Sequence, residues 1–319
     1  MFRYIARRVL LAIPTLIMVS LLIFALMRIV PGDAALLKVY GGEDILGDPE
    51  AYDAARQQLG LDRSYPVQYL DWIWRMLCCG DMGVSFWTKR PVAEEIVARL
   101  PVTVELAVLA MIVAVLIGIP AGVVSATYAD RPIDYFARLA ATIGLAIPNF
   151  WLGTMLVVFL GFWLGYSPPL GFVPFFQDPW KNLQQMYLPA LTLGTAFAAA
   201  SMRMCRTQML EVLRQDYIVT ARAKGLHEQA VVLRHALRNA LIPVVTVTGL
   251  QLAVLLGGAV VVESVFTLPG LGTSTVLAIN LRDYPQIQAN ALFIATLLII
   301  ANLLTDIVYA WIDPRIRYS

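Results

Sequence analysis

Residues 9–30 read VLLAIPTLIMVSLLIFALMRIV, a run of 22 mainly apolar residues. A helix that crosses the hydrocarbon core of a bilayer needs about 20 such residues, so this run is long enough to span a membrane. Arg3, Arg7 and Arg8 precede it, as in a secretory signal, but the apolar core of a signal peptide has only about 7–15 residues. No A-x-A cleavage site follows the run. The stretch therefore predicts a retained first transmembrane helix.

The composition of the whole chain also favours the bilayer as its solvent. Of 319 residues, 59% are hydrophobic and only 14% are charged, and the mean hydropathy is +0.70. In soluble domains about a quarter of the residues are charged. The net charge of +2 is too small to suggest a nucleic-acid-binding protein, and no basic arm is present.

Three cysteines, Cys78, Cys79 and Cys205, show no metal-ligand or redox spacing. We expect Cys78 and Cys79 to be two incidental thiols, with a redox-active pair as the alternative. A framework of disulfides is not expected.

Five further segments complete a predicted set of six transmembrane helices. Four are long apolar runs and one, Tyr187–Met202, is shorter and is followed by Arg203. The long runs are 104–126, 137–164, 243–265 and 288–312.

The distribution of Lys and Arg predicts the orientation of these helices. Cytoplasmic loops of membrane proteins carry an excess of basic residues. With the N-terminus inside, the cytoplasmic segments hold 14 basic and six acidic residues, whereas the outer connections 165–186 and 266–287 hold only Lys181 and Arg282 as basic residues. The chain is predicted to be an all-α polytopic membrane protein with six helices and both termini cytoplasmic, in a bacterial or archaeal cytoplasmic membrane.

This topology divides the chain into three parts. Residues 1–30 form the N-terminus and first helix, residues 31–103 an extracytoplasmic segment, and residues 104–319 a five-helix core with a cytoplasmic insert at 203–241. Tyr69, Trp72 and Trp74 of the outer segment suit the level of a membrane interface. That segment is either a docking surface for an extracytoplasmic partner or a packing cap over the helix ends.

The cytoplasmic insert includes most of the stretch 220–243, TARAKGLHEQAVVLRHALRNALIP. At about 39 residues the insert is too long for a plain connector, since helix connections usually have 2–8 residues. Gly225 suits a left-handed helix cap, and Arg222 and Lys224 place positive charge at that helix end. Pro243 is expected in the first turn of the following span. The pattern predicts a helix, a break at Gly225 and a second helix.

Each predicted helix of the insert has an apolar face. The face before the break comprises Leu210, Leu213, Tyr217 and Ala221. The face after it comprises Ala230, Leu233, Leu237, Ala240 and Leu241. These faces are explained either by an amphipathic hairpin lying on anionic lipid or by docking to a soluble partner.

TARAKGL followed by RHALRNALIP resembles the EAA loop of ABC importer permeases, in the version found in the dipeptide/oligopeptide/nickel family. Counting back from Gly225, Ala221 matches the last Ala of E-A-A, while Val219 and Thr220 replace the Glu and the first Ala. The nearest upstream carboxylate is Asp216. The other family-like segments are RYIARRVLLAIPTLIMVSLLIFALMRIVPGD (3–33), LPVTVELA (100–107), AIPNFWLGTML (146–156), LPALTLG (188–194), ESVFTLPGLGTSTVLAINLRDYP (263–285) and DPRIRY (313–318).

The resemblance implies the fold of a type I ABC importer permease, specifically the first permease subunit with its long outer segment. It implies that the insert couples to an ATPase. The coupling residues are then Asp216, Thr220, Ala221, Arg222, Ala223, Lys224 and Gly225. The implied partners are a second homologous permease, two ABC ATPase subunits and an extracytoplasmic solute-binding protein. Peptides are the implied cargo, with nickel chelates, glutathione or opine-like compounds as alternatives.

The sequence predicts a transport subunit without its own chemistry. It lacks a G-x-x-x-x-G-K-[ST] phosphate loop, G-x-S-x-G and H-E-x-x-H, and we expect no cofactor or metal. His227 and His235, eight residues apart, are expected to be ordinary surface histidines.

Polar residues inside the spans are candidates for the transport pathway, because such groups in hydrocarbon are costly unless they face protein or water. They are Asn149, Gln251, Asn302 and Asp306. Asp306 either makes a structural hydrogen bond or contacts substrate. An ion-coupled secondary transporter that uses Asp306, and a membrane scaffold with a docking hairpin, are the alternative function classes.

Overall fold

The computed structural model describes residues 2–29, 49–58, 60–165, 167 and 171–312. Within these residues every regular element is a helix, and one isolated bridge joins Val84 to Pro91. The elements are α1 (Phe2–Ile29), α3 (Pro49–Gln58), α4 (Tyr65–Cys79), α5 (Val92–Thr127), α6 (Pro132–Ala146), α7 (Asn149–Leu164), α8 (Pro179–Val212), α9 (Asp216–Ala223), α10 (Glu228–Ala230), the π-helix η1 (Val231–Ala236), α11 (Leu237–Val265), α12 (Leu271–Asn280) and α13 (Tyr284–Ile312).

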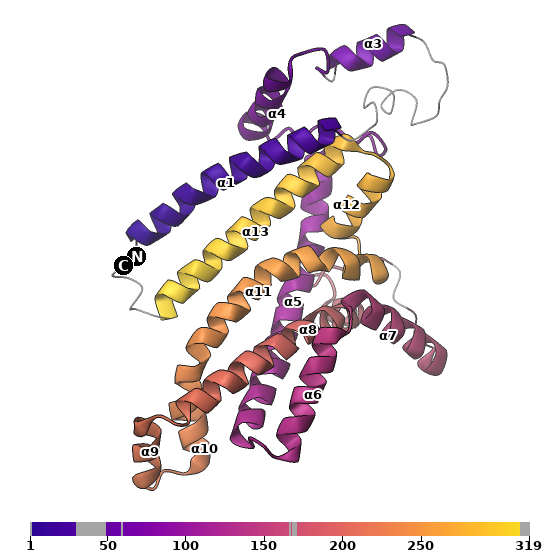
Figure 1. Ribbon diagram of the computed structural model, residues 1–319. Coiled ribbons are helices and arrows are strands. Elements are labelled where there is room, and N and C mark those ends of the chain that lie inside the picture. The colour runs from indigo at the N-terminus through magenta and orange to yellow at the C-terminus, as the bar shows by residue number, and fades with distance from the viewer. Residues whose placement is uncertain (1, 30–48, 59, 166, 168–170, 313–319) are drawn as a thin grey trace.

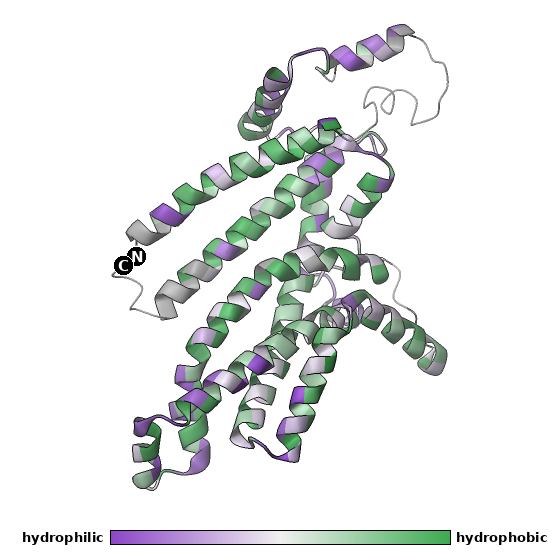
Figure 2. Ribbon diagram, viewed as in Figure 1, coloured by the Kyte–Doolittle hydropathy of each residue, from purple (hydrophilic) through white to green (hydrophobic). Residues whose placement is uncertain are grey.

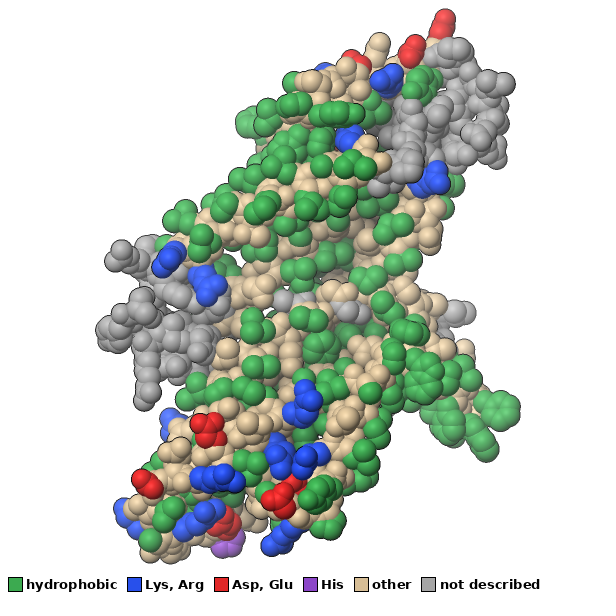
Figure 3. All heavy atoms as spheres, viewed as in Figure 1, with side chains coloured by type: hydrophobic (Ala, Val, Ile, Leu, Met, Phe, Trp, Pro, Cys, Tyr) green, Lys and Arg blue, Asp and Glu red, His purple; other side chains and the backbone are tan. Residues whose placement is uncertain are grey.

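The long helices form an elongated bundle with short elements at its two ends (Figure 1). The α3 and α4 helices lie at the top of this view and α9 and α10 at the bottom, and α1 packs antiparallel to α13. Hydrophobic residues dominate α1, α5 and α13, whereas α9 and α10 carry hydrophilic and hydrophobic residues together (Figure 2). On the face shown in Figure 3, charged side chains gather at the ends and hydrophobic ones between them. This distribution is typical of a protein whose central part is surrounded by the hydrocarbon of a membrane.

Four helical segments are long and apolar enough to cross a membrane: Ala6–Ile29, Val92–Thr127, Glu228–Gly257 and Tyr284–Thr305. They contain or overlap the predicted spans 9–30, 104–126, 243–265 and 288–312, so the helical structure of those runs is confirmed. A bent pair of helices raises the number to five if it counts as one span.

That bent pair corrects the prediction of one continuous helix at 137–164. The region is divided into α6 and α7, whose axes differ by 100°. Pro148 lacks a backbone N–H and disfavours the helical conformation at the residue before it. Accordingly Ile147 is extended, with φ −82° and ψ 123°. The run is apolar throughout, but its backbone breaks at the proline.

The α8 helix is much longer than the predicted Tyr187–Met202. It has 34 residues, which corresponds to about 51 Å at a rise of about 1.5 Å per residue. The Asp178 side chain caps its first turn by accepting a hydrogen bond from the Lys181 N–H at 3.1 Å. Our expectation that the helix ends at Arg203 was wrong. A charged residue favours water over lipid around that part of the helix, but it does not break the backbone hydrogen bonds, so the helix continues.

The most extensive helix contact among the described residues joins α5 to α8, and glycines make it possible. A Cβ atom placed on Gly118, Gly122 or Gly194 would lie 2.6, 2.8 or 2.6 Å from a backbone oxygen of the other helix. Small residues at such crossings allow helices in lipid to pack by van der Waals contact. The main core, which includes the fully buried Leu106, Leu193 and Leu255, lies where α5, α8 and α11 meet.

The short helix α12 was not predicted, and a buried carboxylate positions it. Glu263 in α11 is completely buried. Its carboxylate accepts hydrogen bonds from the Thr103 hydroxyl at 2.6 Å and from the Thr273 N–H at 3.0 Å. The Thr103 oxygen in turn accepts from the Leu271 N–H at 2.9 Å. Glu263 and Thr103 therefore satisfy N–H groups of the first turn of α12, which have no partners within the helix.

We expect Glu263→Ala to release α12 from the bundle. Each lost hydrogen bond costs about 0.5–1.5 kcal/mol, and each buried donor left without an acceptor costs about 1–3 kcal/mol. The variant should show a lower melting temperature in detergent and faster tryptic cleavage at Arg282, which is exposed beyond the end of α12. Glu263→Gln keeps one acceptor oxygen and should lose less stability. Equal melting temperatures for wild type and Glu263→Ala would contradict this role.

The outer segment contacts the end of α1 through α4. The Ser20 and Tyr69 hydroxyls lie 2.8 Å apart, and the Phe24 ring contacts the rings of Tyr69 and Trp72 at centroid distances of 5.5 and 6.2 Å. These contacts fit a packing cap. The Trp74 side chain, in contrast, is 68% exposed and remains available to a partner. Both predicted roles of this segment are therefore compatible with the described residues.

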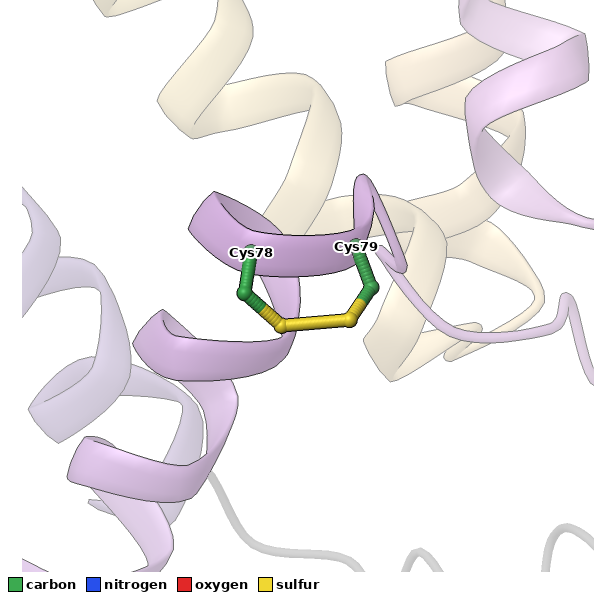
Figure 4. The surroundings of a disulfide bond; sticks show 2 residues. All are labelled: Cys78 and Cys79. Atoms are coloured by element: carbon green, nitrogen blue, oxygen red, sulfur yellow. A yellow bond between two sulfur atoms is a disulfide. The ribbon is translucent and has the colours of Figure 1, made fainter.

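Cys78 and Cys79 differ from the predicted pair of free thiols. Their sulfur atoms are bonded to each other at the end of α4 (Figure 4). Adjacency in the chain holds their Cα atoms only 3.8 Å apart. Cys205, by contrast, is a free and buried cysteine.

Candidate functional site

The cytoplasmic insert folds as the predicted helix, break and helix. The α9 helix ends at Ala223, and Gly225 has a φ of 77°, in the left-handed region that glycine adopts readily. Its N–H donates to the Arg222 carbonyl at 2.9 Å, and the Leu226 N–H donates to the Ala221 carbonyl at 3.4 Å. A Cβ atom on Gly225 would meet nothing within 4 Å. The backbone conformation, and not crowding, therefore favours glycine here.

An ion pair bridges the break between α9 and α10. The Arg222 Nε and Nη2 donate to the two carboxylate oxygens of Glu228 at 3.1 and 2.7 Å. The carboxylate raises the pKa of the Arg222 guanidinium above its ordinary value, since it stabilises the charged form. Because the side chains are 42% and 53% exposed, the pair adds at most about 1 kcal/mol to stability. Its effect is to hold the turn in one geometry.

Six of the seven proposed coupling residues lie on the outside of the hairpin. Asp216, Thr220, Arg222, Ala223, Lys224 and Gly225 are exposed, and Ala221 is buried. Asp216 begins α9, where a negative charge is favoured by the helix dipole. The Thr220 hydroxyl donates to the Asp216 carbonyl at 2.9 Å. The hairpin thus presents exposed polar groups to a neighbouring protein, with the exposed apolar side chains of Val219 and Leu226 among them.

The buried side of the hairpin joins it to the transmembrane bundle. Ile218 and Ala221 of α9 pack in one cluster with residues of η1, α5, α8 and the start of α11. Its members from these other elements are Val123, Ala126, Cys205, Met209, Val231, Val232, Ala236, Ala240 and Val244. A force on α9 would therefore reach three long helices through direct packing.

The predicted apolar faces of the insert were partly wrong. Tyr217 and Leu233 are 42% and 59% exposed, while Val231 and Val232 are buried. Before the break, α8 ends at Val212 and α9 begins at Asp216. The predicted face therefore spans two separate helices and does not follow a single 3.6-residue period. After the break, η1 is a π-helix. Its wider turns rotate the buried face away from the one that a regular α-helix would present.

Pro243 also differs from its prediction as a first-turn proline. It lies inside α11, which begins at Leu237 and continues directly from η1. The second helix of the insert and the following span are therefore one nearly continuous helical segment. No loop separates the hairpin from α11.

Asp134 and Arg206 form a buried ion pair beside the hairpin, and the sequence reasoning did not find it. Asp134 is fully buried in the first turn of α6. Arg206 in α8 donates to its two oxygens at 2.8 and 2.7 Å. The Ser125 hydroxyl and the Asp130 N–H also donate to this carboxylate. The only sequence signals were one acidic residue in a helix first turn and one arginine in α8.

The four pathway candidates lie on three helices, α7, α11 and α13. Gln251 in α11 accepts a hydrogen bond from the Ser201 hydroxyl of α8 at 3.2 Å. Asn149 begins α7 directly after the break, and Asn302 is exposed on α13. The side chain of Asp306 lies outside the described part. No described contact joins Asn149, Gln251 and Asn302 to one another.

A cavity of about 300 Å³ lies between α5, α11 and α13, and its lining residues Leu252 and Thr305 are sequence neighbours of Gln251 and Asp306. Its lining is mostly apolar, with the hydroxyls of Thr246, Thr248 and Thr305. The hydroxyls of Thr248 and Thr305 donate to carbonyls of their own helices. The cavity therefore offers a mostly apolar surface between three helices.

His227 and His235 do not form a site together. The His227 Nδ1 accepts from the Gln229 N–H at 3.3 Å at the start of α10. Across the described residues no group of three or more His, Cys, Asp or Glu side chains is arranged to hold a metal ion.

Two family descriptions match the chain. Residues 118–318 match "Binding-protein-dependent transport system inner membrane component", and residues 1–107 match "Binding-prot-dependent transport system membrane comp, N-term". A putative peptide transport system permease protein of Brucella abortus is 42% identical, with 99% of each chain covered. The dipeptide permease DppB of Alkalihalophilus pseudofirmus is 40% identical and the glutathione permease GsiC of Escherichia coli 43%, each over all of both chains.

Solved structures share the fold at low identity. A chain of the methionine ABC transporter MetNI in an inward-facing conformation has a TM-score of 0.56 and 18% identity, with 69% of this chain and 96% of that one covered. A chain of an amino acid ABC transporter has a TM-score of 0.51 and 16% identity, with coverages of 70% and 94%. The likeness extends to the helical fold of these two chains.

Fold and sequence together define a membrane permease that works with a separate ATPase. The chain belongs to the binding-protein-dependent transport permeases and is a permease component of an ABC importer. The predicted family and function are confirmed, as is the absence of an ATPase role for this subunit. The secondary-transporter and scaffold alternatives are thereby set aside.

Proposed function

We propose that the α9–α10 hairpin is the joint through which ATPase subunits drive this permease. The observation that carries the proposal is the two-sided hairpin: an exposed polar surface around Gly225, and a buried side packed on α5, α8 and α11. ATP-driven closure of two ABC ATPases would move the hairpin of this chain and that of a second homologous permease. Since α11 continues directly from η1, the motion shifts the bundle between inward-facing and outward-facing states. Nucleotide and substrate drive such a switch only if their affinities for the two states differ.

The proposed topology has six membrane spans and both termini in the cytoplasm of a bacterium or archaeon. The four long apolar helices, the α6–α7 pair and α8 supply the six. In support, α1 begins and α13 ends toward the same end of the bundle as the hairpin (Figure 1). The basic residues Arg203, Arg206 and Arg222 lie on the side that the excess of positive charge assigns to the cytoplasm. The α3 and α4 helices then lie outside, where a solute-binding protein docks.

Peptides or similar small solutes are the proposed cargo. The relatives that match over the full chain are named peptide, dipeptide and glutathione transport permeases. Glutathione is itself a small peptide with a thiol group. Nickel chelates and opine-like solutes are the alternatives. The pathway follows α7, α11 and α13, with Asn149, Gln251, Asn302 and Asp306 as its polar groups. The partner binding protein selects the cargo, and this pathway tolerates it.

We expect Gly225→Pro to abolish co-purification of the ATPases and uptake of a labelled dipeptide. Proline fixes φ near −65°, far from the observed 77°, so the turn cannot keep its geometry. The matched control is Gly165→Pro, which removes another left-handed glycine, with φ 64°, at the end of α7. That variant should retain ATPase binding. Melting temperatures of both variants show whether the bundle remains folded.

Full ATPase binding and transport in Gly225→Pro would contradict the proposal that the hairpin couples the permease to the ATPases. Competition of the labelled dipeptide by unlabelled peptides, glutathione or a nickel chelate, measured in cells with the intact system, distinguishes the cargo classes. Failure of every peptide to compete would exclude peptides.

A further inference from the structure

A polar cavity of about 180 Å³ lies at the end of the bundle opposite the hairpin, between α1, α4 and the start of α13. Three arginines and two aspartates line it: Arg28, Arg63, Arg75, Asp71 and Asp81. The cavity wall therefore carries one net positive charge. One bound monoanion would neutralise it.

The arginines differ in how they are already paired. Arg75 forms an ion pair with Asp71 at 2.9 Å. Arg28 donates its Nε to the side-chain oxygen of the neutral Gln68 at 3.0 Å, and its guanidinium lies 4.7 Å from the Phe24 ring centroid. Arg63 has no carboxylate partner among the described side chains. Arg28 and Arg63 thus retain N–H donors for an anionic oxygen.

Two buried polar groups of α13 in the same wall lack partners. The Tyr284 hydroxyl and the Gln288 side-chain nitrogen make no hydrogen bond within the described structure, although these residues are only 6% and 8% exposed. Buried polar groups are normally hydrogen-bonded, and an unpaired one calls for an explanation such as a bound water or ion. Both groups can donate, which again suits an anion.

An apolar groove of about 590 Å³ continues from this cavity along α1 and α4. Phe24 and Arg28 line both. Further along, Leu21, Ala25 and Leu70 form the apolar walls of the groove. A ligand that fills both spaces has an anionic head and a hydrocarbon tail.

We propose that this cavity and groove bind one phospholipid, with its phosphate between Arg28 and Arg63 and one acyl chain along α1. The site lies at the end of the apolar span Ala6–Ile29, which is the level of lipid headgroups. Tyr65 and Tyr69 line the groove at that level, where aromatic residues are enriched in membrane proteins. The net charge favours a monoanionic lipid such as phosphatidylglycerol over zwitterionic ones. The lipid would fasten α4, and with it the outer segment, to α1 and α13.

The test is native mass spectrometry of the assembled transporter in detergent with added phosphatidylglycerol, phosphatidylethanolamine or phosphatidylcholine. Wild type should retain phosphatidylglycerol best. Arg28→Gln combined with Arg63→Gln should weaken its retention about tenfold or more, since charge-assisted hydrogen bonds are lost. Ala25→Trp, which fills the groove and keeps both arginines in the chain, should also weaken it. Arg138→Gln, an exposed arginine on α6 near the other end, is the matched control and should retain the lipid.

Competing inorganic phosphate and glycerol phosphate separate a lipid from a free anion. Neither should displace phosphatidylglycerol. Displacement by either, together with normal retention by Ala25→Trp, would overturn the lipid assignment in favour of a free anion. Equal retention by wild type and the double arginine variant would overturn it as well, and leave the cavity to a protein partner. If the double variant does not fold, lipid retention by Arg63→Gln alone is compared with that of wild type, since Arg63 is exposed.

Discussion

Asp134→Asn is expected to lower the free energy of unfolding by about 3–5 kcal/mol, the cost of breaking a buried ion pair by removing one partner. Four donors point at the Asp134 carboxylate: Ser125, Asp130 and two nitrogens of Arg206. An asparagine offers one acceptor oxygen, and its NH₂ group would face other donors. Arg206, whose side chain is only 19% exposed, would keep an uncompensated charge. Thermal unfolding in detergent, followed by tryptophan fluorescence, measures the loss.

The control and the second half of this experiment use the same region. Asp130→Asn removes an exposed carboxylate while keeping a residue that tolerates the positive φ of 60°, and it should change stability by less than about 0.5 kcal/mol. Replacing both partners, Asp134→Leu with Arg206→Met, should cost less than Asp134→Asn alone, because no buried charge is left unpaired. If Asp134→Asn and Asp130→Asn melt at the same temperature, the pair does not hold α6 to α8.

The overall helical architecture could be predicted because membrane spans are encoded locally. A run of about 20 apolar residues carries its own signal, whatever the rest of the chain does. The bend between α6 and α7 was missed for the same reason: apolarity is continuous through Pro148, and hydropathy does not register a missing N–H. The α12 helix was missed because ten residues are too few for a span, and the Glu263 carboxylate that holds it lies in another helix.

In the candidate site, too, locally encoded features could be predicted and tertiary contacts could not. Gly225 was found because a left-handed cap depends on one residue and its immediate neighbours. The buried face after it was assigned wrongly, since a π-helix changes the period on which the assignment rested. Asp134 and Arg206 are 72 residues apart in sequence, and no local pattern links them. Sequence therefore identifies the hairpin, whereas the contacts that fasten it to the bundle depend on tertiary packing.

Gly122→Leu should prevent normal packing of α5 on α8 and cost about 3 kcal/mol or more, at the upper end of what overpacked cores show. Even a Cβ atom there would lie 2.7 Å from the Cys205 Cβ and 2.8 Å from the Met202 carbonyl oxygen. A side chain could rotate away, but a backbone carbonyl within α8 cannot move without breaking its helix. We expect little folded protein, a low melting temperature and no transport.

Gly257→Leu is the matched control for this substitution. Gly257 also lies inside a long apolar helix, but a Cβ atom there would meet nothing within 4 Å. Leucine has a higher helix propensity than glycine by somewhat under about 1 kcal/mol, so this variant should fold as well as wild type. The two variants add the same atoms to the same kind of helix and differ in what those atoms meet. Similar melting temperatures for both would mean that α5 and α8 do not pack through Gly122. The proposed coupling of the hairpin to α5 through this packing would then be wrong.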